Sequence, residues 1–134
     1  LDEGLNIYAV SGYRSYSKQE TIYNGNVSSM GQVEANKVSA IPGQSEHQTG
    51  LSMDVSCQSS GFDLVTAFGE TEEGQWLAAH AHEYGFIIRY PKDKTEITQY
   101  SYEPWHIRYV GVTLATELYE KDITLDQFYE QLMI

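Results

Sequence analysis

Alternation of apolar and polar residues is clearest near the middle of the chain. Three apolar residues there are each followed by a polar one: Leu51, Met53 and Val55. A two-residue period is that of a half-buried β-strand, because successive side chains point to opposite faces. The polar face of this predicted strand presents Ser52 and Asp54. A carboxylate is therefore expected on a regular element rather than in a loop.

Four further runs rich in β-branched and aromatic residues predict strands. They are 6–10, 86–90, 97–102 and 106–110. Pro91 stops the second of these runs, and Glu103, Pro104 and Trp105 separate the last two. Several short strands with brief connections are typical of a small sheet.

Capping signals predict where helices begin. Ser17 with Glu20 and Thr124 with Gln127 each match a capping box, and Thr71 is a good N-cap. The predicted helices are 17 to about 24, where Asn24, Gly25 and Asn26 end the pattern, 29–37, 71–84 followed by Gly85, 113–121 and 125–133. The fold class expected is α+β, with a small, mainly antiparallel sheet and helices packed against it.

Composition narrows the function without identifying it. The 134 residues suit one domain, 1–134, and 41% hydrophobic residues suffice for a core. A net charge of −11 argues against nucleic acid or an anionic membrane as partner. Cys57 is the only cysteine, so neither an internal disulfide nor a cysteine zinc site forms. Because the chain starts at Leu1, close to a strand, we expect it to be trimmed at its N-terminus.

Two segments carry candidate metal chemistry, residues 45–54 and 103–106. Catalytic zinc takes three protein ligands and keeps one position open. His47, Asp54 and His106 offer nitrogen, oxygen and nitrogen donors. Gly50 lets the chain turn between the first two, and His106 begins a predicted strand. These element ends can converge at one rim of the sheet.

The same residues also permit purely structural roles. His47 and His106 can be ordinary loop histidines, and Asp54 a turn residue. Arg14 can pair with one of the 19 acidic residues. Trp105 can be a core residue, and the group of Tyr90, Tyr100 and Tyr102 can line a cleft or cover the sheet. Tyr90 is the best placed of these for a cleft because it ends a predicted strand.

A resemblance changes the balance between these alternatives. The string Ser-x-His-x-x-Gly-x-Ser-x-Asp, followed later by Glu-x-Trp-His, resembles the VanY-type D-alanyl-D-alanine carboxypeptidases and the related LD-carboxypeptidases of peptidoglycan. Residues 11–15 match that family's arginine motif. Three motifs in the same order, over about residues 10 to 111, make a chance match improbable.

The resemblance implies a role for each matching residue. His47, Asp54 and His106 correspond to the zinc ligands, and Glu103 corresponds to the general base that activates a metal-bound water. Arg14 corresponds to the arginine that steadies the oxyanion. The positions implied for substrate contact are Gln19, Ser45 and Trp105, to which Tyr90 is added from its place before Pro91.

The activity expected is removal of the C-terminal D-alanine from a peptidoglycan stem peptide, as a DD- or LD-carboxypeptidase. A zinc-containing binding domain for cell wall or signalling, without turnover, is the alternative. Glu103 and Arg14 favour the enzyme, because a binding domain needs no base beside the metal. Because peptidoglycan lies outside the membrane, we expect the protein to be exported or anchored at the cell surface through a segment absent from this chain. The oligomeric state is not readable from the sequence.

Overall fold

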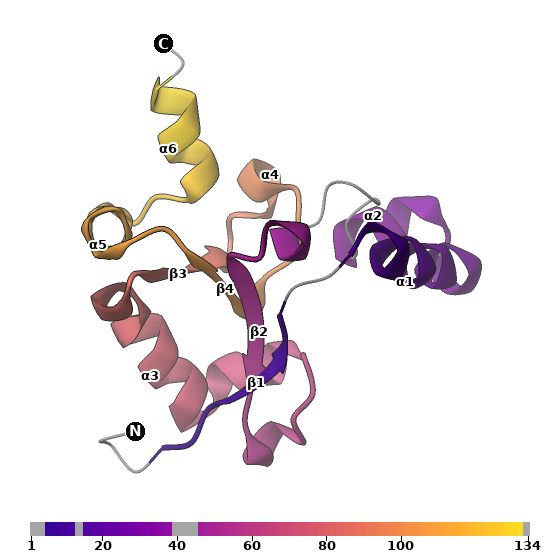
Figure 1. The fold of residues 1–134 in the computed structure, drawn as a ribbon, viewed down its shortest axis with the longest axis horizontal. Helices are drawn as coiled ribbons and strands as arrows, with labels where there is room; N and C mark the ends of the chain where they lie inside the picture. The colour runs from indigo at the N-terminus through magenta and orange to yellow at the C-terminus, as the bar shows by residue number, and fades with distance from the viewer. Residues whose placement is uncertain (1–4, 13–14, 39–45, 133–134) are drawn as a thin grey trace.

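The computed structural model describes residues 5–12, 15–38 and 46–132. Its centre is a four-stranded sheet in the order β1-β2-β4-β3, with every neighbouring pair antiparallel (Figure 1). The strands are β1 (Tyr8–Ser11), β2 (Ser52–Ser56), β3 (Phe86–Tyr90) and β4 (Glu103–Tyr109). The predicted α+β class with a small antiparallel sheet is confirmed.

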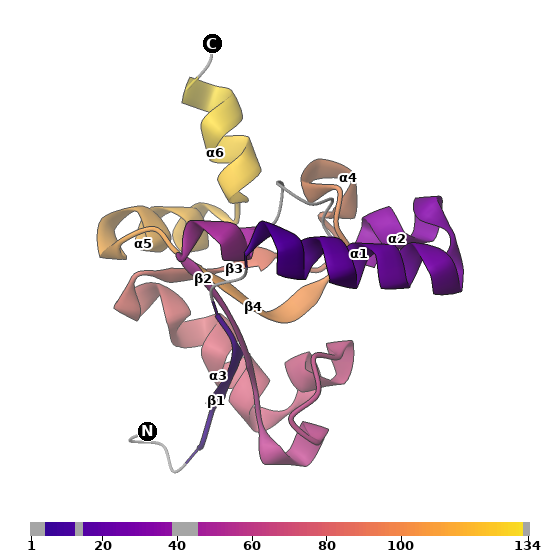
Figure 2. The ribbon, with the colours of Figure 1, turned by 45° about the vertical axis from the view of Figure 1, so that its right-hand side comes forward.

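Helices surround this sheet. The α-helices are α1 (Tyr16–Met30), α2 (Gln32–Val38), α3 (Glu72–His80), α4 (Thr95–Thr98), α5 (Val112–Lys121) and α6 (Leu125–Leu132), and the short 3-10 helices are η1 (Glu46–Thr49), η2 (Gln58–Ser60), η3 (Thr66–Glu70) and η4 (Ala81–Tyr84). In Figures 1 and 2, α1 and α2 lie together on one side of the sheet, away from α5 and α6. Among the described residues, no helix combines the length and apolar character that crossing a bilayer requires.

Two apolar clusters pack the helices onto the sheet. The first joins Val55 of β2 and Ile107 of β4 to Phe68, Leu77 and Ala81 from η3, α3 and η4. The second joins Ile87 of β3 to side chains of α5, α6 and the residues between them, among them Ala115, Leu118 and Leu125. Burial of these side chains holds β2, β3 and β4 in place, and the candidate site depends on their positions.

Local capping follows the sequence signals at three of the predicted boundaries. The Thr71 hydroxyl accepts the backbone N–H of Gly74 at 2.9 Å. Thr124 and Gln127 bond reciprocally, at 2.9 and 3.0 Å, which is the predicted capping box. Gly85 ends η4 with a φ of 88°, a left-handed conformation that glycine adopts without steric cost.

The first helix departs from its prediction at both ends. It begins at Tyr16 with Ser15 as N-cap, whose hydroxyl accepts the Lys18 N–H at 3.3 Å. The predicted cap, Ser17, lies inside the helix. The helix also runs through Gly25 to Met30, because one interior glycine costs only about 1 kcal/mol. The second helix accordingly starts at Gln32 rather than 29.

Segment 97–102 is not the predicted strand. Residues 95–98 form the short helix α4, and Gln99 follows with a φ of 69°, which breaks any extended run. The Thr98 hydroxyl then accepts the Tyr100 N–H at 3.2 Å. Strand β4 instead starts early, at Glu103, where the pairing with β3 is irregular and accommodates Pro104. The predicted helix 71–84 is α3 followed by the 3-10 turn η4.

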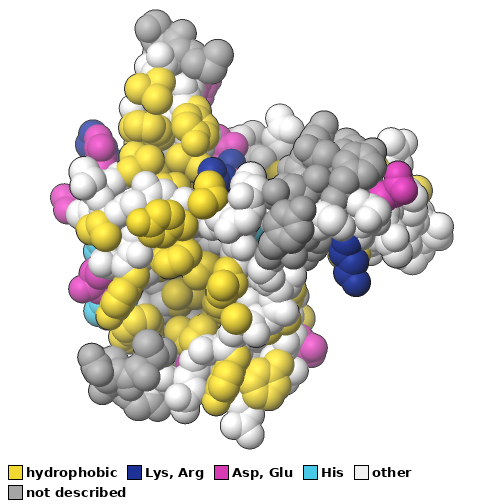
Figure 3. All heavy atoms as spheres, in the orientation of Figure 1, with side chains coloured by type: hydrophobic (Ala, Val, Ile, Leu, Met, Phe, Trp, Pro, Cys, Tyr) yellow, Lys and Arg dark blue, Asp and Glu magenta, His cyan; other side chains and the backbone are white. Residues whose placement is uncertain are grey.

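Burial around β2 follows its alternation only in part. Val55 is buried as expected, but Leu51 and Met53 are 43% and 38% exposed, and Ser52 and Asp54 are buried. Apolar side chains gather on the surface drawn in Figure 3, across the sheet and along α6. The polar face is buried because it meets η1 and β4, whose side chains satisfy its hydrogen-bonding groups.

A pair of glycine substitutions tests this packing. A Cβ at Gly74 would lie 1.9 Å from the Phe68 carbonyl oxygen, so Gly74→Ala should destabilise the fold by about 1–3 kcal/mol or more. Gly25, in α1, has no atom within 4 Å of such a Cβ. Gly25→Ala should stabilise by about 0.5–1 kcal/mol. Thermal unfolding measures both, and equal melting temperatures for the two variants would contradict the tight contact.

Candidate metal centre

Three elements bring the three predicted ligands together. Asp54 of β2 and His106 of β4 are directly opposite in the antiparallel ladder. His47 lies in η1, the turn that leads into β2. Their ligand atoms all fall within 4.8 Å of one another, and the three residues are 2–4% exposed. In the part of the chain that the structure describes, this is the one group of three or more His, Cys, Asp or Glu residues placed to share an ion.

Hydrogen bonds orient both histidines toward Asp54. The Nδ1 atom of His47 lies 2.6 Å from the Gly12 carbonyl oxygen, which can only accept, so Nδ1 carries the proton. Nε2 of His47 is therefore the atom with a free lone pair, and it lies 3.1 Å from Asp54 Oδ2. Nδ1 of His106 lies 3.0 Å from Asp54 Oδ1. Two imidazole nitrogens and one carboxylate form a donor set that suits zinc.

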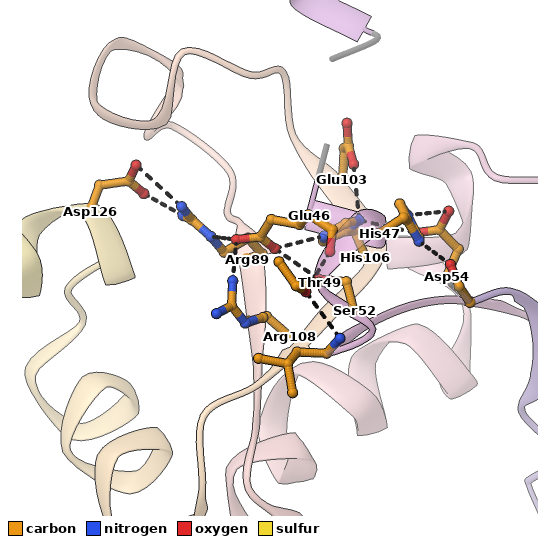
Figure 4. A network of polar contacts seen from close by, with 12 residues as sticks. Glu46, His47, Thr49, Ser52, Asp54, Arg89, Glu103, His106, Arg108 and Asp126 are labelled. Carbon is orange, nitrogen blue, oxygen red and sulfur yellow. Dashed lines mark hydrogen bonds and ion pairs between the residues drawn. The ribbon is translucent and has the colours of Figure 1, made fainter. Parts of the chain in front are cut away.

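Glu103 lies beside this group. Its Oε1 is 3.7 Å from Nδ1 of His106, the nitrogen that also faces Asp54 (Figure 4). The side chain is 12% exposed, so the carboxylate is partly shielded from water. It lies opposite Tyr90 in the pairing of β3 with β4. Glu103 is thus next to the proposed ligands without being part of the three-residue group.

The predicted substrate-contacting residues lie in different places. Tyr90 is buried, with its ring 5.0 Å from that of His106, and burial raises the pKa of its hydroxyl, which stays protonated. Trp105 packs against the first apolar cluster. Gln19 is a buried residue of α1. Arg14 and Ser45 lie outside the described residues. Contact of these side chains with substrate stays a prediction.

A partly buried polar network next to the metal group was not predicted. Glu46 bonds His106 and Ser52, and it pairs with Arg89 and Arg108 (Figure 4). Position 46 lies inside the family motif but at one of its variable places, so the motif gives no signal for it. Its four partners come from β2, β3 and β4, between 6 and 62 residues away.

Comparison with known proteins adds a family to this geometry. A family model described as "VanY: D-alanyl-D-alanine carboxypeptidase" matches residues 1–112. The chain belongs to this family. The match includes the three clustered residues and Glu103, which confirms the resemblance seen in the motifs.

Relatives within the family share both sequence and fold. The putative carboxypeptidase YodJ of Bacillus subtilis (strain 168) is 52% identical over 129 residues, 96% of this chain and 47% of that protein. The LdcB LD-carboxypeptidase structure has a TM-score of 0.90 at 52% identity, covering 96% of this chain and 60% of that one. A mutant of the D,D-pentapeptidase VanY from a VanB-type resistance cassette, solved in complex with Zn(II), gives 0.82 at 36% identity, covering 96% and 74%. The chain spans about half the length of the curated VanY-family relative YodJ.

Zinc uptake should depend on pH in a defined direction. Burial by itself lowers the pKa of His106, but its hydrogen bonds with Asp54 and Glu46 outweigh burial and raise it to about 9. A metal binds the neutral imidazole, so zinc must displace this proton below about pH 9. In protein stripped with a chelator, the apparent zinc affinity should therefore rise, by up to about tenfold per pH unit between about pH 6 and 8. Competition titrations against a chromophoric chelator measure it, and a flat profile would contradict the expectation.

Proposed function

We propose that this chain is the catalytic unit of a zinc-dependent carboxypeptidase that removes a terminal D-alanine from peptidoglycan stem peptides. The observation that carries the proposal is the buried group of His47, Asp54 and His106 with Glu103 beside it. Membership of a family described by D-alanyl-D-alanine carboxypeptidase activity supports the substrate class. The acidic chain, at −11, also suits a peptide rather than a polyanion as substrate.

His47, Asp54 and His106 would hold the zinc. When bound, zinc acts as a Lewis acid on a carbonyl oxygen and lowers the pKa of water to about 7. The protein contributes two histidines whose ring orientations its own hydrogen bonds set, and a carboxylate whose pKa those histidines hold below its ordinary value despite burial. Asp54 is therefore ionised and ready to coordinate at neutral pH.

Glu103 is proposed as the general base. Its Oε1 lies 3.7 Å from Nδ1 of His106, so the carboxylate would be in place to take a proton from a water beside the metal group. The same carboxylic acid can then donate that proton to the amine of the departing D-alanine. A base that lies beside the ligands, and is not one of them, keeps its proton-accepting oxygen available.

The remaining proposed roles concern the substrate. Arg14 is proposed to stabilise the oxyanion, and its fork of N–H donors also suits a terminal carboxylate. Tyr90 is proposed to form part of the pocket wall, since its neutral ring lies against His106. Gln19, Ser45 and Trp105 are proposed to contact the peptide. Because peptidoglycan lies outside the membrane, we propose that the chain acts there.

Defined stem peptides test the function. Purified protein with added zinc is incubated with tri-, tetra- and pentapeptide stems, and the products are weighed by mass spectrometry. Loss of one alanine from the pentapeptide indicates DD-carboxypeptidase activity, and loss from the tetrapeptide indicates LD-carboxypeptidase activity. A chelator should stop either reaction. Peptide binding that survives the chelator, with no product from any stem, would support the binding domain and refute the enzyme.

A further inference from the structure

His106 faces carboxylates with both of its ring nitrogens. Nδ1 points to the metal group, 3.0 Å from Asp54 Oδ1. Nε2 points the other way, 3.1 Å from Oε1 of Glu46 (Figure 4). A histidine that binds a metal is neutral, so it has one N–H and one lone pair. If the N–H is on Nε2 and bonds Glu46, the lone pair is on Nδ1, toward Asp54.

The carboxylate of Glu46 is itself held on both oxygens. Oε1 also accepts a hydrogen bond from the Ser52 hydroxyl at 3.0 Å, and Oε2 accepts from Nε of Arg89 and, at 2.9 Å, from Nη1 of Arg108. Its side chain is 11% exposed. Its four partners therefore hold this carboxylate in one orientation as an acceptor.

Arg89 extends the network to the last helix. Its guanidinium also pairs with Asp126 of α6, through Nη1 and, at 3.4 Å, through Nη2. The same guanidinium lies 5.0 Å from the centroid of the Tyr90 ring. The orientation of Glu46 thus depends on α6, which is distant in sequence from η1. Figure 4 shows the contacts running from Asp126 through Arg89 and Glu46 to His106.

If Glu46 served only to neutralise the charges of Arg89 and Arg108, it would not need its hydrogen bonds to His106 and Ser52. Three of the four partners of Glu46, namely Ser52, His106 and Arg108, lie on the two strands that carry Asp54 and His106. Glu46 also immediately precedes His47, so one turn supplies a ligand and the support of another ligand. Ligand histidines generally donate their second N–H to such a partner, which sets the ring orientation and raises the basicity of the ligand.

We propose that Glu46 is the positioning residue of the metal centre: it holds the Nε2–H of His106, so that Nδ1 is the atom that binds zinc, and Arg89 with Asp126 fixes its carboxylate. The inference rests on the zinc site of the proposed function. It assigns Glu46 no contact with the substrate. Its consequence is that zinc affinity depends on a side chain that is not a ligand.

Zinc affinity tests the positioning role without any turnover measurement. Glu46→Ala and Glu46→Gln should bind zinc about 10- to 100-fold more weakly in competition with a chelator. Glutamine fails because its NH₂ group must face either the arginines or the His106 N–H. Asp126→Asn changes a residue one step farther from the metal, so it should weaken zinc binding less. The matched control is Glu83→Gln, since Glu83 is an exposed carboxylate that also pairs with a histidine, His80.

Imidazole nitrogen NMR on the zinc-loaded wild type adds a readout that does not depend on a variant folding. We expect His106 to show a protonated Nε2 and a metal-bound Nδ1, and Glu46→Ala to lose the protected Nε2–H signal. Unchanged affinity in both Glu46 variants, or a metal-bound Nε2, would overturn the positioning role while wild-type zinc binding stands. A wild type that takes up no zinc would overturn the proposed function, and this inference with it.

Discussion

His47→Ala should lose bound zinc and hydrolysis together. The substitution removes one of three donors and leaves Asp54 facing a single imidazole. Without the metal, the reaction loses several kcal/mol of charge stabilisation and its activated water. At about 1.4 kcal/mol per factor of ten, turnover should fall by about 10⁴-fold or more. Elemental analysis of the purified variant and the stem-peptide assay measure the two effects.

A surface histidine provides the control for this variant. His80 pairs with Glu83 and stacks on Trp76, with 42% of its side chain exposed, so His80→Ala should keep zinc and activity. Circular dichroism establishes that both variants fold. Stoichiometric zinc in folded His47→Ala would exclude His47 as a ligand. Loss of zinc from His80→Ala as well would show that the assay reports general instability.

Glu103→Gln should keep zinc and lose hydrolysis. The amide has the shape of the carboxylate but cannot take a proton, and general-base catalysis typically contributes about 10²- to 10⁴-fold. Because Glu103 lies 3.7 Å from His106 Nδ1 and outside the three-residue group, zinc affinity should change little. Glu103→Ala should show the same loss of hydrolysis with zinc retained. The assay is the release of D-alanine at saturating zinc.

The control here is another glutamate of the same region. Glu96 in α4 is exposed, and Glu96→Gln should leave both zinc binding and turnover unchanged. Near-wild-type turnover in Glu103→Gln would exclude this residue as the base. Loss of zinc in that variant would instead indicate that Glu103 coordinates the metal. Together, His47→Ala and Glu103→Gln distinguish loss of metal binding from loss of general-base catalysis.

Local sequence signals predicted some elements well and others poorly, for physical reasons. The Thr124–Gln127 capping box and the left-handed Gly85 depend only on neighbouring residues, and both formed. The predicted stop of α1 near Gly25 failed because one interior glycine costs a helix only about 1 kcal/mol, which packing of α1 against α2 can offset. Segment 97–102 has the residue types of a strand, but no strand in the described part of the chain pairs with it, and its first two residues belong to α4.

The polar face of β2 shows the limit of periodicity. Alternation correctly separates Asp54 from Met53, but it does not say which face is covered. The covered face is decided by η1 and β4, whose polar groups bond Ser52 and Asp54 and so offset the free-energy cost of burying them. The role of Glu46 could not be predicted for the same reason. Its partners lie on three different strands, and its neighbours in sequence give no signal for them.

The sequence by itself determined the α+β class, the order of the three motifs, and the identity of His47, Asp54, His106 and Glu103 as the candidate chemistry. The fold class follows from residue pattern and spacing, whereas the choice of these four residues over structural alternatives follows from the resemblance of the three motifs to the family. Only the tertiary structure decided which ring nitrogens face Asp54, which face of β2 is buried, and that Glu46 joins His106 to α6 through Arg89 and Asp126. Most of these features depend on contacts between residues 35 to 60 positions apart, which no local pattern records.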